Sequence, residues 1–156
     1  VGGVLVMLAF VGIIAAIAVP NLLASRRAAN EASAIANLRQ LASAEMTYNA
    51  LEGEGYADLN ELARRQLITS NLAGRELSGY KFEVKVTDED FEATATPVSY
   101  GSTGTRSFYV STEGIIRVAD RRGLKARADD PPLIANLREK EVIIDPGGRV
   151  SWPGKQ

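Results

Sequence analysis

The 156-residue chain contains no cysteine and no histidine. The absence of cysteine excludes disulfide bonds and thiolate zinc sites, and the absence of histidine excludes imidazole acid–base catalysis. Haem ligation by either side chain is excluded as well. The net charge at pH 7 is only −1, so nucleic-acid binding through a strong basic field is not expected. These absences leave few routes to an enzyme or to a nucleic-acid-binding protein.

Charge is also missing from the beginning of the chain, where the first charged side chain is Arg26. The preceding apolar run, residues 1–24, is long enough to span a bilayer core, which takes about 20 residues. A cleaved signal peptide would begin with a positive segment and carry a shorter apolar core. The run therefore predicts a helix that lies in lipid or among other copies of itself.

Helical spacing continues past this run into an amphipathic segment, residues 25–52. Small and apolar residues recur at steps of three and four, as in Ala28, Ala32, Ile35 and Leu38. Glycines at 53 and 55 are typical of a helix end. We expect one helix from near the N-terminus to about Leu51, roughly 75 Å long. A single domain of this size cannot cover such a helix along its whole length.

Pro20 lies inside this predicted helix. Proline removes one helical hydrogen bond, here the bond to the Ala16 carbonyl, and its ring crowds the same oxygen. Gly12 adds a weak helix former. Two interpretations follow for residues 12–20: a mild kink in a membrane helix, or a segment that unwinds when the protein leaves the bilayer.

The pattern changes to that of a head, residues 53–132. Asp58 is a candidate N-cap for a short helix that ends near Arg65. Four stretches read as strands in two hairpins, around 80–86, 91–96, 106–112 and 114–120. The predicted fold is α+β, with the second half of the long helix packed on a four-stranded antiparallel sheet. The expected packing residues are Ile35, Leu38, Tyr80, Phe82 and Phe108.

The tail, residues 133–156, predicts a β-hairpin that turns at Pro146-Gly147-Gly148. An isolated hairpin is marginally stable in water. The strand pair is therefore expected to close the sheet of its own head or, as a slightly weaker alternative, to lie on a neighbouring subunit. The only tryptophan, Trp152, would anchor it in either case.

The segment GIIAAIAVPNLLASRRAANEASAIANLRQLASAEMTY, residues 12–48, resembles the N-terminal helix of type IV pilins and type II secretion pseudopilins. The later FYVSTEGIIRVAD, residues 108–120, resembles a strand-turn-strand of many pilin-like heads. The resemblance is specific over about the first third of the chain.

The resemblance implies a structural subunit that waits in the bacterial inner membrane and then polymerises into a helical surface filament. Its partners would be copies of itself and the pilus or secretion assembly machinery, without nucleic acid or a small-molecule substrate. In the family, the segment between a glycine and the proline is often unwound in the filament, which corresponds to Gly12 and Pro20. The filament core would be formed by the apolar side chains of the run: Val4, Leu5, Leu8, Phe10, Val11, Ile13, Ile14, Ile17 and Val19.

One position departs from the family pattern. Pilins usually carry a glutamate seventeen residues before this proline, and the corresponding residue here is Gly3. Val1 lies two residues short of the start that is usual in the family. Either the protein lacks the glutamate, which would suggest a minor or tip subunit, or the first residues are not the native ones.

Other functions have less support in the sequence. Acidic pairs such as Asp129-Asp130 fall in predicted turns, so no catalytic residue, cofactor or metal site is expected. A pseudopilin that forms a short periplasmic filament for type II secretion, or a minor or tip subunit, remains the alternative to a surface pilin. A single-span membrane protein with a ligand-binding head is disfavoured by the alanine-rich half of the helix, because small residues allow close helix packing.

Overall fold

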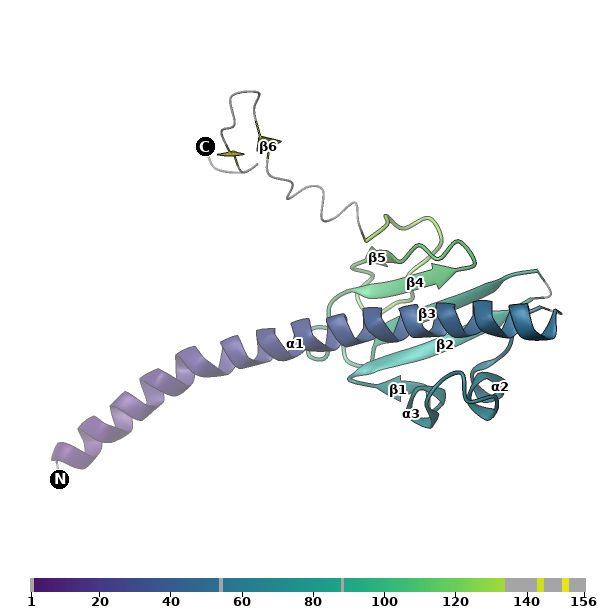
Figure 1. Cartoon of the computed structure of the whole chain (residues 1–156). Helices are drawn as coiled ribbons and strands as arrows, with labels where there is room; N and C mark the ends of the chain where they lie inside the picture. The colour runs from purple at the N-terminus through teal and green to yellow at the C-terminus, as the bar shows by residue number, and fades with distance from the viewer. Residues whose placement is uncertain (1, 54, 88, 134–142, 145–149, 152–156) are drawn as a thin grey trace.

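The computed structural model describes residues 2–53, 55–87, 89–133, 143–144 and 150–151, and within residues 2–18 it gives the exposure of Gly3 and Met7 only. A long helix, α1 (Gly2–Glu52), extends away from a head that packs around its C-terminal half (Figure 1). The head adds two short helices, α2 (Leu59–Arg64) and α3 (Ser70–Ala73), and an antiparallel sheet. The predicted α+β class and the long N-terminal helix are confirmed.

Helix α1 is continuous through Gly12 and Pro20 in the single chain. Figure 1 shows it curving gradually, as long helices do, without a break at the proline. The unwinding expected for an assembled filament therefore stays a prediction. The helix ends at Gly53, whose φ of 70° is the left-handed conformation that glycine adopts at little cost, and its N–H donates to the Asn49 carbonyl at 2.9 Å.

The sheet has five strands, so the prediction of four was wrong. The strands follow chain order: β1 (Glu76–Leu77), β2 (Tyr80–Val86), β3 (Phe91–Pro97), β4 (Ser107–Ser111) and β5 (Arg117–Ala119). The additional strand, β1, is only two residues long, too short to show the alternation that reveals a strand. It pairs with β2 across Ser78-Gly79, where both residues have positive φ as the tight hairpin turn requires.

The hydrophobic core lies between α1 and one face of this sheet. Leu38, Tyr80, Phe82 and Phe108 are fully buried there, and Ile35 is half-buried against them. Strand β3 alternates as its sequence suggests, with Phe91, Ala93 and Ala95 inward. The head therefore holds the C-terminal half of α1 as one wall of its core.

The opposite face of the sheet is partly covered by residues 120–130. Ser107 donates its hydroxyl to the Leu124 carbonyl at 2.7 Å, and Ala126 is buried. Asp130 secures this segment by accepting hydrogen bonds from the Arg121 guanidinium and the Arg127 N–H. This cover explains why every residue of β4 is buried, on both faces of the sheet.

The tail forms the expected strand pair, β6 (Ile143–Ile144) with β7 (Val150–Ser151). The pair is a separate two-stranded sheet, so the favoured prediction that it closes the sheet of its own head was wrong. The physical reason lies at the β5 edge, which residues 131–133 already occupy: Val118 donates to Pro131, and Leu133 donates to Ile116. The predicted turn at 146–148 and Trp152 lie outside the described residues.

Candidate assembly surface

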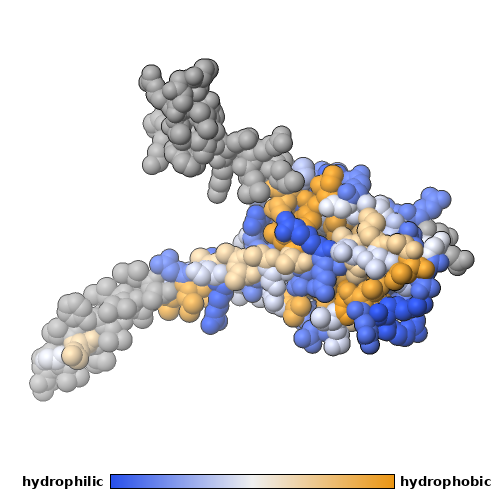
Figure 2. Space-filling view, viewed as in Figure 1, coloured by the Kyte–Doolittle hydropathy of each residue, from blue (hydrophilic) through white to orange (hydrophobic). Residues whose placement is uncertain are grey.

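The surface that the head leaves uncovered on α1 begins where the helix emerges from it. Among the residues of α1 whose exposure the structure gives, Glu31 is the buried residue nearest the N-terminus. All residues from 19 to 26 are exposed, among them the large apolar side chains of Val19, Leu22 and Leu23. Figure 2 shows this apolar surface on the part of α1 that projects from the head.

Of the side chains predicted to form a filament core, Val19 alone is among those described, and it is exposed. The other eight lie outside the described side chains. Gly3 is exposed, and a Cβ added to it would meet no atom within 4 Å. In the single chain, the position where pilins usually carry glutamate therefore has room for a side chain.

Among the residues that the structure describes with their side chains, no helix combines the length and apolarity needed to cross a membrane. The predicted membrane segment, residues 1–24, lies largely outside those residues and stays a prediction.

Where α1 enters the head, a buried carboxylate fastens the helix to the β3–β4 loop. Glu31 Oε1 accepts hydrogen bonds from the Thr105 N–H at 2.9 Å and from the Arg106 N–H at 3.2 Å. Its Oε2 pairs with the Arg106 guanidinium at 2.7 Å. Burial raises the pKa of Glu31, but these donors outweigh it and hold that pKa below its usual value. Glu31 is therefore a charged residue that binds α1 to the head, and we call its contacts with Thr105 and Arg106 the Glu31 clasp.

Two further side chains of α1 extend this clasp towards the N-terminus. Asn30 donates to the Thr103 carbonyl at 2.9 Å, and Arg27 donates to the Gly101 carbonyl at 3.1 Å. An open groove of about 360 Å³ follows, lined by Pro20, Leu23, Arg27, Gly101 and Ser102. These bonds thus hold the loop residues Gly101 and Ser102 as one wall of the groove. The exposed apolar part of α1 forms the other wall.

The β3–β4 loop fits closely against the core as well as against α1. Tyr80 donates its hydroxyl to the Arg106 carbonyl at 2.8 Å. A Cβ at Gly104 would overlap the Tyr80 ring, so only glycine fits there. The loop is consequently held from two sides, which makes the helix–head junction rigid.

A second buried carboxylate, Glu45, lies two turns before the end of α1 and has a different environment. Its side chain is fully buried; Oε2 accepts the Ala57 N–H at 2.9 Å, and Oε1 has no hydrogen-bond partner. Burial raises the pKa of Glu45 to about 7, against the lowering effect of the Ala57 N–H and with a contribution from the charge of Asp58. The Glu45 carboxyl group lies beside residues 55–58. Below about pH 7 it is therefore mainly neutral.

Neither Glu31 nor its partner was identified from the sequence. The available signal was that Glu31 is the only acidic residue before Glu45. It also falls on the buried side of the helix, at the three- and four-residue steps Glu31, Ala34, Leu38, Leu41 and Glu45. The contact with Arg106, 75 residues away along the chain, had no signal in the sequence.

The described residues do not bring together a group of three or more acidic side chains that could hold a metal ion. Asp58 instead caps α2 by accepting the Glu61 N–H at 2.8 Å, which confirms the predicted cap. Asp90 accepts from the Thr112 hydroxyl at 2.7 Å. These acids are used to fix local structure.

Comparisons with known proteins found no family model that matches the chain and no curated protein that matches it. The functional argument therefore depends on the uncovered half of α1 and on its junction with the head.

Proposed function

We propose that the chain is a structural subunit of a type IV pilus-like bacterial surface filament, held in the inner membrane before assembly. In this proposal the N-terminal half of α1 is an anchor in lipid first and a filament core later. The subunit carries no catalytic activity and no cofactor. Its function is to bury that half of the helix against other copies of itself.

One observation carries the proposal: α1 is 51 residues long, and of its side chains that the structure describes, the head buries none before Glu31. The sequence before Arg26 is uncharged and mostly apolar. Burial of apolar surface stabilises an association by about 25 cal/mol per Å². Lipid or neighbouring helices would supply that burial, and the head cannot.

The clasp at Glu31 supports the same proposal. In a filament of this kind, the helices pack in the core and the heads form the surface. The packing of the helices can set the arrangement of the heads only if each head is fixed rigidly to its own helix. The bonds from Glu31, Asn30 and Arg27 to residues 101–106 provide this coupling at the point where α1 leaves the head. A membrane anchor alone would have no need for a rigid junction.

The test compares Ile13→Asp with Asn71→Asp, which adds the same charge at an exposed position of α3. Ile13→Asp is expected to abolish filaments in electron microscopy of material sheared from cells, while protease resistance of the head is unchanged. Asn71→Asp is expected to give the wild-type yield. Filaments of normal yield from Ile13→Asp would refute the proposal.

The same micrographs separate the alternatives. Antibody labelling along the filaments indicates the main subunit, and labelling confined to their ends indicates a minor or tip subunit. A pseudopilin that forms only a short periplasmic filament would give no filaments at the cell surface. A chain that stays monomeric in detergent and never forms filaments would instead fit a single-span membrane protein.

A further inference from the structure

The end of the head from which the N-terminal half of α1 emerges, called here the proximal end, exposes large apolar side chains (Figure 1). Val98, Tyr100 and Leu124 are exposed there, and Leu124 is 69% exposed. Val98 and Leu124 line one open groove of about 400 Å³. Exposed apolar side chains that lie together indicate an interaction surface. Three other large apolar residues are also exposed, but do not line this groove: Met46, Leu51 and Ile115.

The turn that presents Leu124 is held by its neighbours. Arg122 and Gly123 both have positive φ, 52° and 84°, a conformation that is uncommon for arginine. Asp120 accepts hydrogen bonds from the Arg122 N–H and from the Tyr100 hydroxyl, each at 3.0 Å. A Cβ at Gly123 would lie 3.4 Å from the Tyr100 Cβ. The turn therefore holds a basic side chain and an exposed leucine beside Tyr100.

The position of α1 in a bilayer determines the depth of the proximal end. The headgroup layer extends about 5–7 Å beyond the apolar core on each side, which corresponds to four or five helical residues. The predicted membrane segment, residues 1–24, is followed in this layer by Arg26 and Arg27. Arg27 donates to the Gly101 carbonyl at 3.1 Å. The β3–β4 loop, with Tyr100, therefore lies at the depth of the headgroups while α1 is in the membrane.

The proximal end is positively charged, whereas the rest of the chain is negative. The groove, the turn and the adjoining part of α1 carry five basic and three acidic side chains, and the nearby Glu31–Arg106 pair adds no net charge. The whole chain has a net charge of −1, so the remainder carries −3. An excess of basic residues favours contact with anionic lipids. The basic residues are Arg26, Arg27, Lys81, Arg122 and Lys125, and the acidic residues are Glu76, Glu83 and Asp120.

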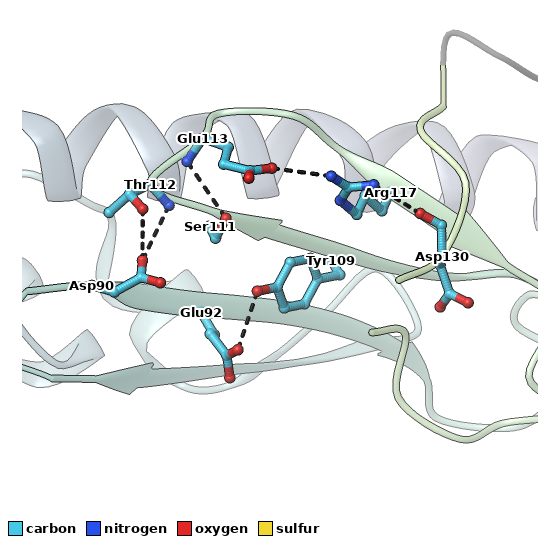
Figure 3. A network of polar contacts seen from close by, with 8 residues as sticks. All are labelled: Asp90, Glu92, Tyr109, Ser111, Thr112, Glu113, Arg117 and Asp130. Carbon is cyan, nitrogen blue, oxygen red and sulfur yellow. Dashed lines mark hydrogen bonds and ion pairs between the residues drawn. The ribbon is translucent and has the colours of Figure 1, made fainter. Parts of the chain in front are cut away.

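The opposite end of the sheet has the opposite charge. Residues 85–92 and 110–117, which contain the β2–β3 and β4–β5 turns, include five acidic and two basic side chains. This end would be repelled by anionic headgroups, so the proximal end alone suits them. Figure 3 shows three of these acids held by neighbouring side chains: Asp90 by Thr112, Glu92 by Tyr109 and Glu113 by Arg117.

We infer that, before assembly, the proximal end of the head is seated in the headgroup layer of the membrane. Tyr100 and Leu124 enter this layer, and Arg26 and Arg122 face the phosphates of anionic phospholipids. The inference rests on the proposed function and adds a lipid surface as a partner of the head. Tyrosine suits the layer because its ring is apolar and its hydroxyl is polar, and arginine can place its apolar stem in lipid with its charge at the phosphates. The head of a waiting subunit is therefore held in one orientation to the membrane.

Quenching of a fluorescent probe by lipids tests the seating, because the natural chain has no cysteine and a single labelling site can be introduced. Leu124→Cys and the control Ile115→Cys, both at exposed positions, are labelled with an environment-sensitive dye in the full chain. Each is reconstituted in vesicles of phosphatidylethanolamine and phosphatidylglycerol, with and without a lipid that carries a spin label on its headgroup. The probe at residue 124 is expected to lose most of its fluorescence to the spin label, and the probe at residue 115 is expected to lose none.

A charge variant tests the arginine contact in the Leu124→Cys background. Arg122→Gln removes one positive charge at the lipid surface and is expected to lower the ratio of seated to unseated heads about fivefold. The matched control is Arg39→Gln, an exposed arginine that lies about 18 Å beyond Arg27 along α1. It is expected to leave the quenching unchanged.

Flotation of the vesicles on a density gradient separates this inference from the proposed function. A chain that floats with the vesicles, but is quenched no more at residue 124 than at residue 115, overturns the seating and leaves the proposed function standing. Equal effects of Arg122→Gln and Arg39→Gln also overturn the inference. A chain that does not float with the vesicles counts against both the membrane anchor and the seating.

Discussion

At the scale of single residues, the two buried carboxylates of α1 have opposite electrostatic environments. Glu31 is surrounded by donors and is held as an anion, whereas Glu45 has one donor and a buried oxygen without a partner. The pKa of Glu45, raised to about 7 from 4.5, makes its contribution to stability depend on pH. Between these two values the folded chain holds a proton that the unfolded chain releases.

Glu45 should therefore destabilise the head as pH rises. The stabilisation that the protonated Glu45 carboxyl gives to the folded state is fully present below about pH 4.5. It is lost by about pH 7, which lowers the free energy of unfolding by about 3 kcal/mol. Glu45→Gln cannot ionise, so it should be more stable than the wild type at pH 8, and the gap should vanish near pH 5. Urea unfolding of the full chain in detergent at both pH values measures this.

The matched control for this prediction is Glu52→Gln, an exposed position on the same helix. It should leave the pH dependence of unfolding unchanged. Equal slopes of stability against pH for the wild type and Glu45→Gln would contradict the assignment.

Removing Glu31 should open the helix–head junction. Glu31→Ala leaves the N–H groups of Thr105 and Arg106 without their acceptor, at an expected cost of about 2–4 kcal/mol in the free energy of unfolding. Hydrogen exchange at these two amides should accelerate more than exchange in β2. Glu113→Ala, which removes the exposed partner of the ion pair with Arg117, should change stability by less than about 1 kcal/mol.

At the scale of elements, α1 tests how a proline is accommodated inside a long helix. Pro20→Ala should restore the hydrogen bond to the Ala16 carbonyl and stiffen the helix, by as much as about 3 kcal/mol locally. Amide exchange around residues 16–21 in detergent should slow, and filament yield should fall if unwinding is needed for assembly. Faster exchange would show that the proline does not weaken the helix.

Several elements followed from the sequence because local chemistry determines them. The end of α1 near Leu51 follows from glycine, and the start of α2 follows from Asp58. Strands β2 and β3 follow from alternation. Helix α3 and strand β1 were missed because four and two residues carry no periodic pattern. Their conformation depends on packing beside β2, which a local pattern does not encode.

The candidate site was predicted to a similar extent. The apolar run and Pro20 are local features, so they were visible in the sequence. The contacts of Glu31 with Thr105 and Arg106 were not visible in the sequence, because these residues come together only when the sheet has folded against α1. The same holds for the groove that Val98 and Leu124 line together, since these two residues are neighbours only in space.

At the scale of the whole molecule, the strand pair β6–β7 is a separate sheet, and its removal should spare the head. Deleting residues 141–156 keeps Leu133, whose N–H pairs with Ile116, so unfolding of the head should change by less than about 0.5 kcal/mol. Filament yield then reports whether the tail lies on a neighbouring subunit: a loss indicates that it does. A strongly destabilised head would contradict the separation of the two sheets.

The position of the Glu31 clasp has a mechanical consequence. It lies at the point where α1 leaves the head, so a pull along the helix meets the bonds to Gly101, Thr103, Thr105 and Arg106 before it reaches the sheet. These bonds lie side by side between the same two segments. A pulling force on the helix is therefore divided among them, and they do not break one after another. The β3–β4 loop thus couples the helix to the head under tension, and a force on the helix would reach the core only after these bonds had broken.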